Sequence, residues 1–179
     1  MRSAGWIIGR NTALLGLLLV LAHTASAESE SRSVQVTATI LPRLELTVTP
    51  ETGRDIAFGA VMQPATGDET MRTVKVNVGV FSNLGHPYHV TQTVRHPLTN
   101  TEGMPIADAQ FQVLTSDATL GQLGAAQPTS IVPGAATTLY LSNDRGKSDS
   151  FNADYRLTVT PTTPAGDFVT DILYTVTSL

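Results

Sequence analysis

The sequence contains no cysteine. Exported domains of this size are often stapled by disulfides, and thiolates also serve as zinc ligands and as attachment points for haem or lipid. The absence of cysteine excludes all of these, so the fold must depend on packing and strand pairing. Tryptophan is nearly absent as well: Trp6 is the only one, and it lies in the leader predicted below. The commonest platform for stacking sugars is therefore missing from the rest of the chain.

Positive charge is scarce and scattered. The chain has 11 Lys and Arg against 15 Asp and Glu, and its only lysines are Lys75 and Lys147. Two of the arginines, Arg2 and Arg10, fall in the predicted leader, so nine basic and all 15 acidic residues remain after it, a formal net charge of −6. Nucleic-acid binding normally needs a clustered basic surface. The charge pattern argues against that function.

Long apolar runs are also missing, apart from one near the start. Arg2 and Arg10 precede an apolar run at Ala13–Ala22, and the small residues Ala25-Ser26-Ala27 precede Glu28. This order is typical of a secretory signal peptide, and the run is shorter than the roughly 20 residues of a membrane-spanning helix. We predict a signal peptide over residues 1–27 and one exported domain over residues 28–179. We expect the domain to lie in the periplasm, at the cell surface or outside the cell, with no integral membrane segment.

Helical periodicity is the last notable absence. No window of 11 to 18 residues repeats its apolar positions every 3.6 residues, whereas threonine supplies 24 of residues 28–179. β-Branched residues suit the pleated, half-buried surface of a strand. The composition therefore predicts an all-β chain.

Alternation of apolar and polar residues predicts where the strands lie. It is strict over Ser33–Ile40, where Val34, Val36, Ala38 and Ile40 share one face, and most regular over Thr73–Val80. Further strands are expected at Leu44–Pro50, Asp55–Phe58, Tyr88–Val94, Gln110–Thr115, Thr137–Ser142, Tyr155–Thr160 and Phe168–Thr177. Turn residues separate these segments, as in a sandwich. We predict a single immunoglobulin-like antiparallel β-sandwich of about seven to nine strands.

No catalytic motif is recognisable. The sequence has neither a G-x-S-x-G elbow nor an H-E-x-x-H pair, so we expect no enzymatic activity and no bound cofactor. His86, His89 and His96 lie close together in the sequence. Zinc needs three or four converging ligands, and no carboxylate near them has a suggestive spacing. Histidines of a turn and a strand edge are the preferred interpretation, with a zinc site as the alternative.

Several carboxylates gather in the last third of the chain: Asp144, Asp149, Asp154, Asp167 and Asp171. Calcium sites in exported β-proteins use such residues. No D-x-D-x-D-G-like loop is present, however, because Asn143-Asp144-Arg145-Gly146 has an arginine at its centre. Solvated turn carboxylates are the preferred interpretation, and calcium binding is the alternative.

Both ends of the predicted domain resemble those of bacterial pilin-type subunits. Ser33–Val61 resembles the opening of the spore-coat-U and archaic chaperone–usher class, in which a V-x-V-x-A-x-I strand precedes an I-x-F-G-x-V step. The tail Gly166–Leu179 is similar to the closing strand of fimbrial subunits. The chain departs from the class in lacking its cysteine pair and in having Ser178, not tyrosine, as the penultimate residue. The resemblance implies an edge-open sandwich that assembles with a chaperone or with copies of itself.

These observations favour a non-enzymatic structural subunit or accessory protein of a bacterial surface or fimbrial-type assembly. Its partners would be copies of itself, related subunits or a periplasmic chaperone. The candidate exchanged strand carries Val34, Val36, Ala38 and Ile40, and the receiving groove is expected near Ile172, Tyr174 and Val176. The same segment would serve equally as the first strand of its own sandwich. The alternative function is a monomeric binding module that uses loops such as Asn83–His89 and Thr99–Pro105.

Overall fold

The computed structural model describes residue 32 and residues 35–179. The predicted signal peptide and Val34 lie outside the described residues. The chain divides into two units, Met1–Thr39 and Ile40–Leu179, and the strands described below lie in the second. Its strands are β1 (Leu44–Pro50), β2 (Thr70–Ser82), β3 (Tyr88–Val94), β4 (Phe111–Ser116), β5 (Gln122–Leu123), β6 (Thr129–Ser130), β7 (Ala136–Leu141), β8 (Asp149–Val159) and β9 (Ile172–Ser178).

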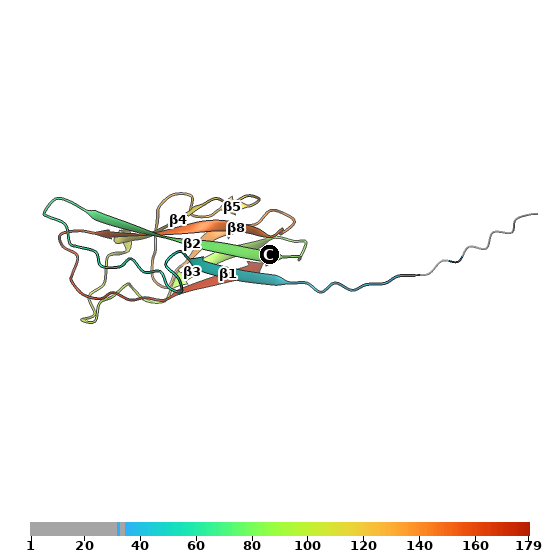
Figure 1. Cartoon of the computed structure of the whole chain (residues 1–179), viewed down its shortest axis with the longest axis horizontal. Helices are drawn as coiled ribbons and strands as arrows, with labels where there is room; N and C mark the ends of the chain where they lie inside the picture. Colours follow the sequence, from blue (N-terminus) through green and yellow to red (C-terminus); the bar gives the residue numbers. More distant parts are fainter. Residues whose placement is uncertain (1–31, 33–34) are drawn as a thin grey trace, which may run out of the picture. The chain divides into compact units, whose positions relative to one another are not determined.

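The strands form two sheets, so the predicted all-β sandwich is confirmed (Figure 1). One sheet has the order β1-β2-β8-β4-β6 and the other β5-β7-β3-β9. Every pair of neighbours is antiparallel. A single 3₁₀ turn, η1 (Asp108–Gln110), precedes β4. No helix within the described part of the chain is long and apolar enough to cross a membrane.

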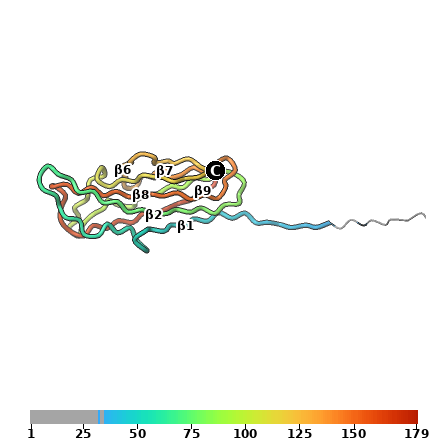
Figure 2. The backbone as a smooth tube through the Cα atoms, turned by 45° about the horizontal axis from the view of Figure 1, so that its top comes forward, coloured from blue at the N-terminus to red at the C-terminus, as the bar shows by residue number. Residues whose placement is uncertain are grey.

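The strand order resembles that of an immunoglobulin sandwich, with β5, β6 and β7 added at the sheet edges. Such sandwiches place strands A, B, E and D in one sheet and C, F and G in the other. Here β1, β2, β8 and β4 take the first four places, and β3 and β9 take the places of C and F. The backbone tube shows the two layers, with β1 at the lower edge and β6 and β7 at the opposite one (Figure 2). Among the described residues, no strand takes the place of G beside β9.

The core lies between the sheets and follows the predicted alternation. Val74, Val76, Val78 and Val80 of β2 are all buried, and the matching positions of β3 and β8 are buried too. Aromatic side chains fill the interior, where the rings of Tyr140 and Phe151 stack with their centroids 5.1 Å apart. Burial of this kind drives the folding of a domain that has no disulfide to constrain it.

Two predicted strands are wrong. Residues 35–40 belong to no strand, and the side chains of Val36 and Ile40 are 90% and 84% exposed. Asp55–Phe58 forms no strand either, because its apolar residues enter the core from a loop. Phe58, for example, meets the ring of Phe111 edge-on, with centroids 6.2 Å apart. Alternation in a short segment indicates which side chains point inward, but it does not indicate whether the backbone forms hydrogen bonds with a neighbouring strand.

Strand boundaries differ from the prediction as well. β8 begins at Asp149, six residues before the predicted start, and β9 begins at Ile172, not at Phe168. The two-residue strands β5 and β6 were not predicted. They are too short to display an alternation, and they exist because β7 and β4 offer them partners.

The turn that precedes β8 is predicted to tolerate no side chain at Gly146. Gly146 has φ +54°, and a Cβ atom there would lie 1.9 Å from the carbonyl oxygen of His86. We expect Gly146→Ala to lower the free energy of unfolding by about 3 kcal/mol or more, measured by urea denaturation, since backbone strain and overlap add. Gly134→Ala is the control, because Gly134 has φ +78° but open space around it. Gly134→Ala should lower the free energy of unfolding only by the roughly 1–2 kcal/mol that a left-handed backbone costs a residue with a Cβ. Equal losses for the two variants would contradict an overlap between residue 146 and the carbonyl oxygen of His86.

Candidate functional site

The free edge of β9 is the most distinctive feature of the domain. β9 pairs with β3 along its whole length and has no second neighbour among the described residues. The bonds Arg95 N–H to Asp171 O and Leu179 N–H to Pro87 O set the phase of this ladder. Since antiparallel ladders alternate, the backbone groups of Leu173, Thr175 and Thr177 bond to β3. Those of Ile172, Tyr174 and Val176 point to the free edge.

β1 forms the corresponding edge of the other sheet. Among the described residues it pairs with β2 alone. The bonds from Asn83 N–H to Arg43 O and from Glu51 N–H to Lys75 O show which of its residues bond to β2. The same alternation leaves the backbone groups of Leu44, Leu46 and Val48 without a ladder partner. β1 and β9 approach each other, and Figure 1 draws them in blue and red along the lower edge of the molecule.

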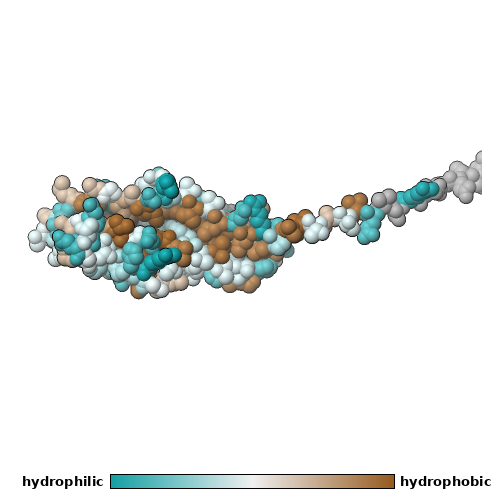
Figure 3. Space-filling model, turned by 90° about the horizontal axis from the view of Figure 1, so that it is seen from below, coloured by the Kyte–Doolittle hydropathy of each residue, from teal (hydrophilic) through white to brown (hydrophobic). Residues whose placement is uncertain are grey.

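Between these two edges runs a half-open apolar seam. Leu44, Leu46 and Val48 of β1 and Ile172, Tyr174 and Val176 of β9 all pack against the core but are only partly buried. The inner strands differ, because the inward side chains of β3 are buried completely. Seen from this side, apolar atoms form a stripe along the domain (Figure 3). The seam thus combines unpaired backbone groups with apolar surface, the two features that an added strand uses.

Three of the predicted interface residues therefore lie together. Ile172, Tyr174 and Val176 present both their backbone groups and their side chains to the seam. Val36, Ala38 and Ile40 lie in the segment that forms no strand, and all three are exposed. Leu44, Leu46 and Val48 were not predicted as interface residues, because the sequence does not reveal that β1 lies at an edge.

A buried polar network lies beneath β9. The hydroxyl of Tyr155 donates to Oε1 of Gln92 on β3, and it lies 2.7 Å from the hydroxyl of Tyr174. Gln92 is only 1% exposed, and its Nε2 has no hydrogen-bond partner within the described part of the chain. Burial raises the pKa of Tyr174 to about 12 and holds that of Tyr155 well above its ordinary value, so both hydroxyls stay protonated at neutral pH. The network ties the edge strand to β3 and β8.

The two tyrosines of this network are predicted to differ in their contribution to stability. Tyr155→Phe leaves Oε1 of Gln92 buried without a donor, which costs about 1–3 kcal/mol of unfolding free energy. Tyr174→Phe removes one hydroxyl pair at the edge and should cost about 1 kcal/mol. Urea denaturation of both variants tests the difference. A larger loss for Tyr174→Phe would contradict the assignment of Tyr155 as the central member.

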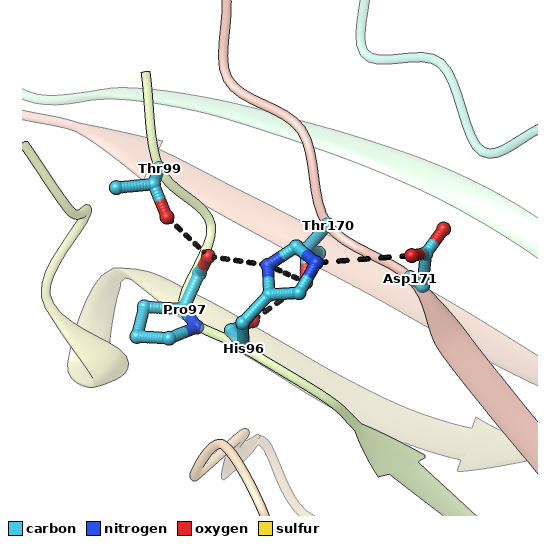
Figure 4. Close-up of polar contacts among 5 residues, drawn as sticks. All are labelled: His96, Pro97, Thr99, Thr170 and Asp171. Atoms are coloured by element: carbon cyan, nitrogen blue, oxygen red, sulfur yellow. Dashed lines mark hydrogen bonds and ion pairs between the residues drawn. The ribbon is translucent and has the colours of Figure 1, made fainter. Parts of the chain in front are cut away.

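A cluster of polar contacts fixes the start of β9 beside the end of β3 (Figure 4). The Thr170 hydroxyl donates to the backbone oxygen of His96 at 2.6 Å, and Nδ1 of His96 lies 3.2 Å from the carbonyl oxygen of Pro97, which also accepts from Thr99 at 2.6 Å. Nε2 of His96 lies 3.7 Å from a carboxylate oxygen of Asp171. Both side chains of this last pair are more than half exposed, so the pair itself adds little stability.

At the opposite end of the domain, Asp149 anchors a loop. Its Oδ2 accepts the Tyr140 hydroxyl at 2.7 Å and the backbone N–H groups of Leu120 and Gly121 at 2.8 and 3.3 Å. Burial acts to raise the pKa of Asp149, but the hydrogen bonds from Leu120 and Tyr140 outweigh burial and hold the pKa below its ordinary value. The sequence named Asp149 only as one of five candidate calcium carboxylates. Its partners Tyr140, Gly121 and Leu120 are 9, 28 and 29 residues away in the sequence.

Because its pKa is lower in the folded state than in the unfolded chain, Asp149 stabilises the fold above the unfolded pKa. That contribution is lost as the pH falls through the folded pKa. We expect Asp149→Asn to lower the unfolding free energy by about 1–3 kcal/mol at pH 7. The difference from the parent should shrink as the pH is lowered toward 3, as melting temperatures at each pH would show. A difference that stays constant across this range would contradict a role for the ionised carboxylate.

The structure separates the remaining candidate ligands. His86 lies in the loop before β3 and His89 on β3 itself, whereas His96 follows that strand. Among the described residues, no three His, Asp or Glu side chains are placed to hold a metal ion. Within the described part of the chain, one ion pair joins a candidate histidine to a candidate aspartate, that of His96 and Asp171.

Comparison with known proteins gives no assignment of family or function. No protein-family model and no curated protein matches the chain. One similar solved structure is a family 123 glycoside hydrolase from Clostridium perfringens, with 13% identity and a TM-score of 0.43. The match covers 74% of this chain, which spans about a quarter (25%) of that protein.

Proposed function

We propose that the chain is a non-enzymatic structural subunit or accessory protein of an exported bacterial surface assembly, in which copies join by β-strand pairing. The observation that carries the proposal is the seam between β1 and β9. Its backbone groups lack a ladder partner on both sides, and its apolar walls are half-exposed. The partner is a strand of a second copy, added at the free edge of β9.

The chain itself contains a segment that fits this site. Residues 35–40 are in no strand, and the exposed Val36 and Ile40 alternate with polar residues. In an added strand, Val34, Val36, Ala38 and Ile40 would face the core, and Thr37 and Thr39 would face solvent. Burying the apolar face contributes several kcal/mol, at roughly 1.5–3 kcal/mol for each large side chain, before the cost of ordering the segment.

A charge in the donated strand is predicted to abolish assembly without unfolding the subunit. The full chain is expressed with its leader, and the form that the cell exports is purified. Val36→Asp combined with Ile40→Asp places two carboxylates against the apolar seam, so oligomers should fall at least tenfold by size-exclusion chromatography with light scattering. The control is Thr37→Asp with Thr39→Asp, which alters the opposite face of the same segment. Equal oligomerisation of both variants would contradict the proposal.

A peptide of residues 33–40 provides a second measurement. The Val36→Asp, Ile40→Asp variant keeps an empty seam, so the peptide should bind it and raise its melting temperature in a concentration-dependent manner. A peptide of the same composition in scrambled order serves as the control. A monomeric parent together with a peptide that does not bind would leave a stand-alone binding domain, with its function on the loops.

A further inference from the structure

We infer that Asn83 keeps residues 41–43 extended, which disfavours a hairpin between the N-terminal segment and β1 and thereby favours exchange between copies. The inference rests on the proposed function, and it concerns how an exchange partner is chosen. Two N-terminal segments can occupy the seam: that of a second copy and that of the same chain. The competition between them is decided at residues 41–43, which connect the segment to β1.

Chain length excludes one orientation for the chain's own segment. β1 runs from Leu44, at the end where β9 finishes, to Pro50, at the end where β9 begins. A strand antiparallel to β9 would place Ile40 near the start of β9, about 20 Å from Leu44 at 3.3 Å per residue. The four backbone steps from Ile40 to Leu44 span at most about 14 Å. An antiparallel partner for β9 must therefore come from a second copy.

The opposite orientation is open to the chain's own segment. A three-residue turn at 41–43 would fold the segment back on β1 as a hairpin, parallel to β9. Its register would pair Ile40 with Leu44, Ala38 with Leu46 and Val36 with Val48, so that inward side chains meet inward side chains. Such a self-closed monomer would fill the seam and block exchange.

Asn83 opposes this turn through both atoms of its amide. Its Oδ1 accepts the backbone N–H of Arg43 at 2.6 Å, and its Nδ2 donates to the backbone oxygen of Leu41 at 3.0 Å. The backbone N–H of Asn83 also donates to the oxygen of Arg43 at 3.1 Å. One residue thus binds both ends of the connection and continues the β1–β2 ladder beyond its last pair. Residues 41–43 contain no turn in this arrangement.

The side chain of Arg43 reinforces this position. Its guanidinium lies 2.6 Å from a carboxylate oxygen of Glu45 and 5.0 Å from the ring centre of Phe81. These residues are exposed, so the individual contacts are weak. Together with the amide of Asn83 they favour the extended form over the hairpin. Since the open and exchanged states keep these contacts and the self-closed state loses them, Asn83 shifts the balance toward exchange.

The test uses cysteines, because the chain has none of its own. Thr37→Cys and Thr47→Cys are introduced together into the full chain, which is exported, oxidised and analysed on a non-reducing gel. A self-closed chain forms an intramolecular disulfide, because residues 37 and 47 are then directly opposite. Exchange places residue 37 of one copy beside residue 47 of the other and gives disulfide-linked dimers and larger species. In this background, Asn83→Ala should raise the ratio of intramolecular to intermolecular product roughly fivefold or more, since two side-chain hydrogen bonds are lost.

Two further variants complete the design. Asn77→Ala is the matched control, because Asn77 is an exposed asparagine of β2 that bonds Asn152 rather than the connection. Asn83→Asp keeps an acceptor for Arg43 but loses the donor to Leu41, so its effect should lie between those of the parent and Asn83→Ala. If Asn83→Ala fails to fold, the ratio of intramolecular to intermolecular product in Asn83→Asp tests the role of Asn83 in its place.

The outcomes separate this inference from the proposed function. If linked oligomers form but Asn83→Ala behaves like Asn77→Ala, the role of Asn83 is overturned while strand exchange stands. If no variant forms intermolecular products, the proposed function fails and the role of Asn83 fails with it. A shift toward intramolecular product in Asn83→Ala alone, graded through Asn83→Asp, supports both.

Discussion

The architecture depends on one open sheet edge: among the described residues, no strand lies beside β9 on the side away from β3. A strand at the edge of a sheet leaves every second N–H and C=O without a ladder partner. In this domain the same residues, Ile172, Tyr174 and Val176, also carry side chains that point into the core. Backbone groups and apolar surface therefore remain open together. β1 repeats this pattern on the facing sheet, and the seam follows from the two edges combined.

An edge strand with one neighbour needs other attachments, and the structure provides them at three points. Tyr174 binds the buried network of Tyr155 and Gln92 in the middle of β9. The contacts of Thr170 with the backbone of His96 fix its start, and the bond from Leu179 to Pro87 fixes its end. These attachments position β9 from the side of β3 and from beneath. The outer edge stays accessible to another strand.

The connection between the N-terminal segment and β1 adds a topological constraint. The short connection excludes a strand of the same chain antiparallel to β9 but permits a hairpin with β1, which would run parallel to β9. The chain alone therefore does not determine which segment fills the seam. The amide of Asn83 acts at this point, because it binds both Leu41 and Arg43. A single side chain at a loop start is in a position to bias self-closure against exchange, because its amide binds Leu41 and Arg43 while the connection is extended.

The sequence by itself determined the class of fold and the inward face of most strands, since alternation is a local property of the backbone. It predicted Val74, Val76, Val78 and Val80 as core residues and β9 as an alternating strand, both correctly. It did not distinguish a paired strand from a loop in Asp55–Phe58, because side-chain burial and backbone pairing are separate requirements. Only the tertiary structure decided which strands lie at edges and what Asn83, Gln92 and Asp149 contact. Most of their partners lie about 30 to 60 residues away in the sequence, and contacts over such distances depend on how the sheets are assembled.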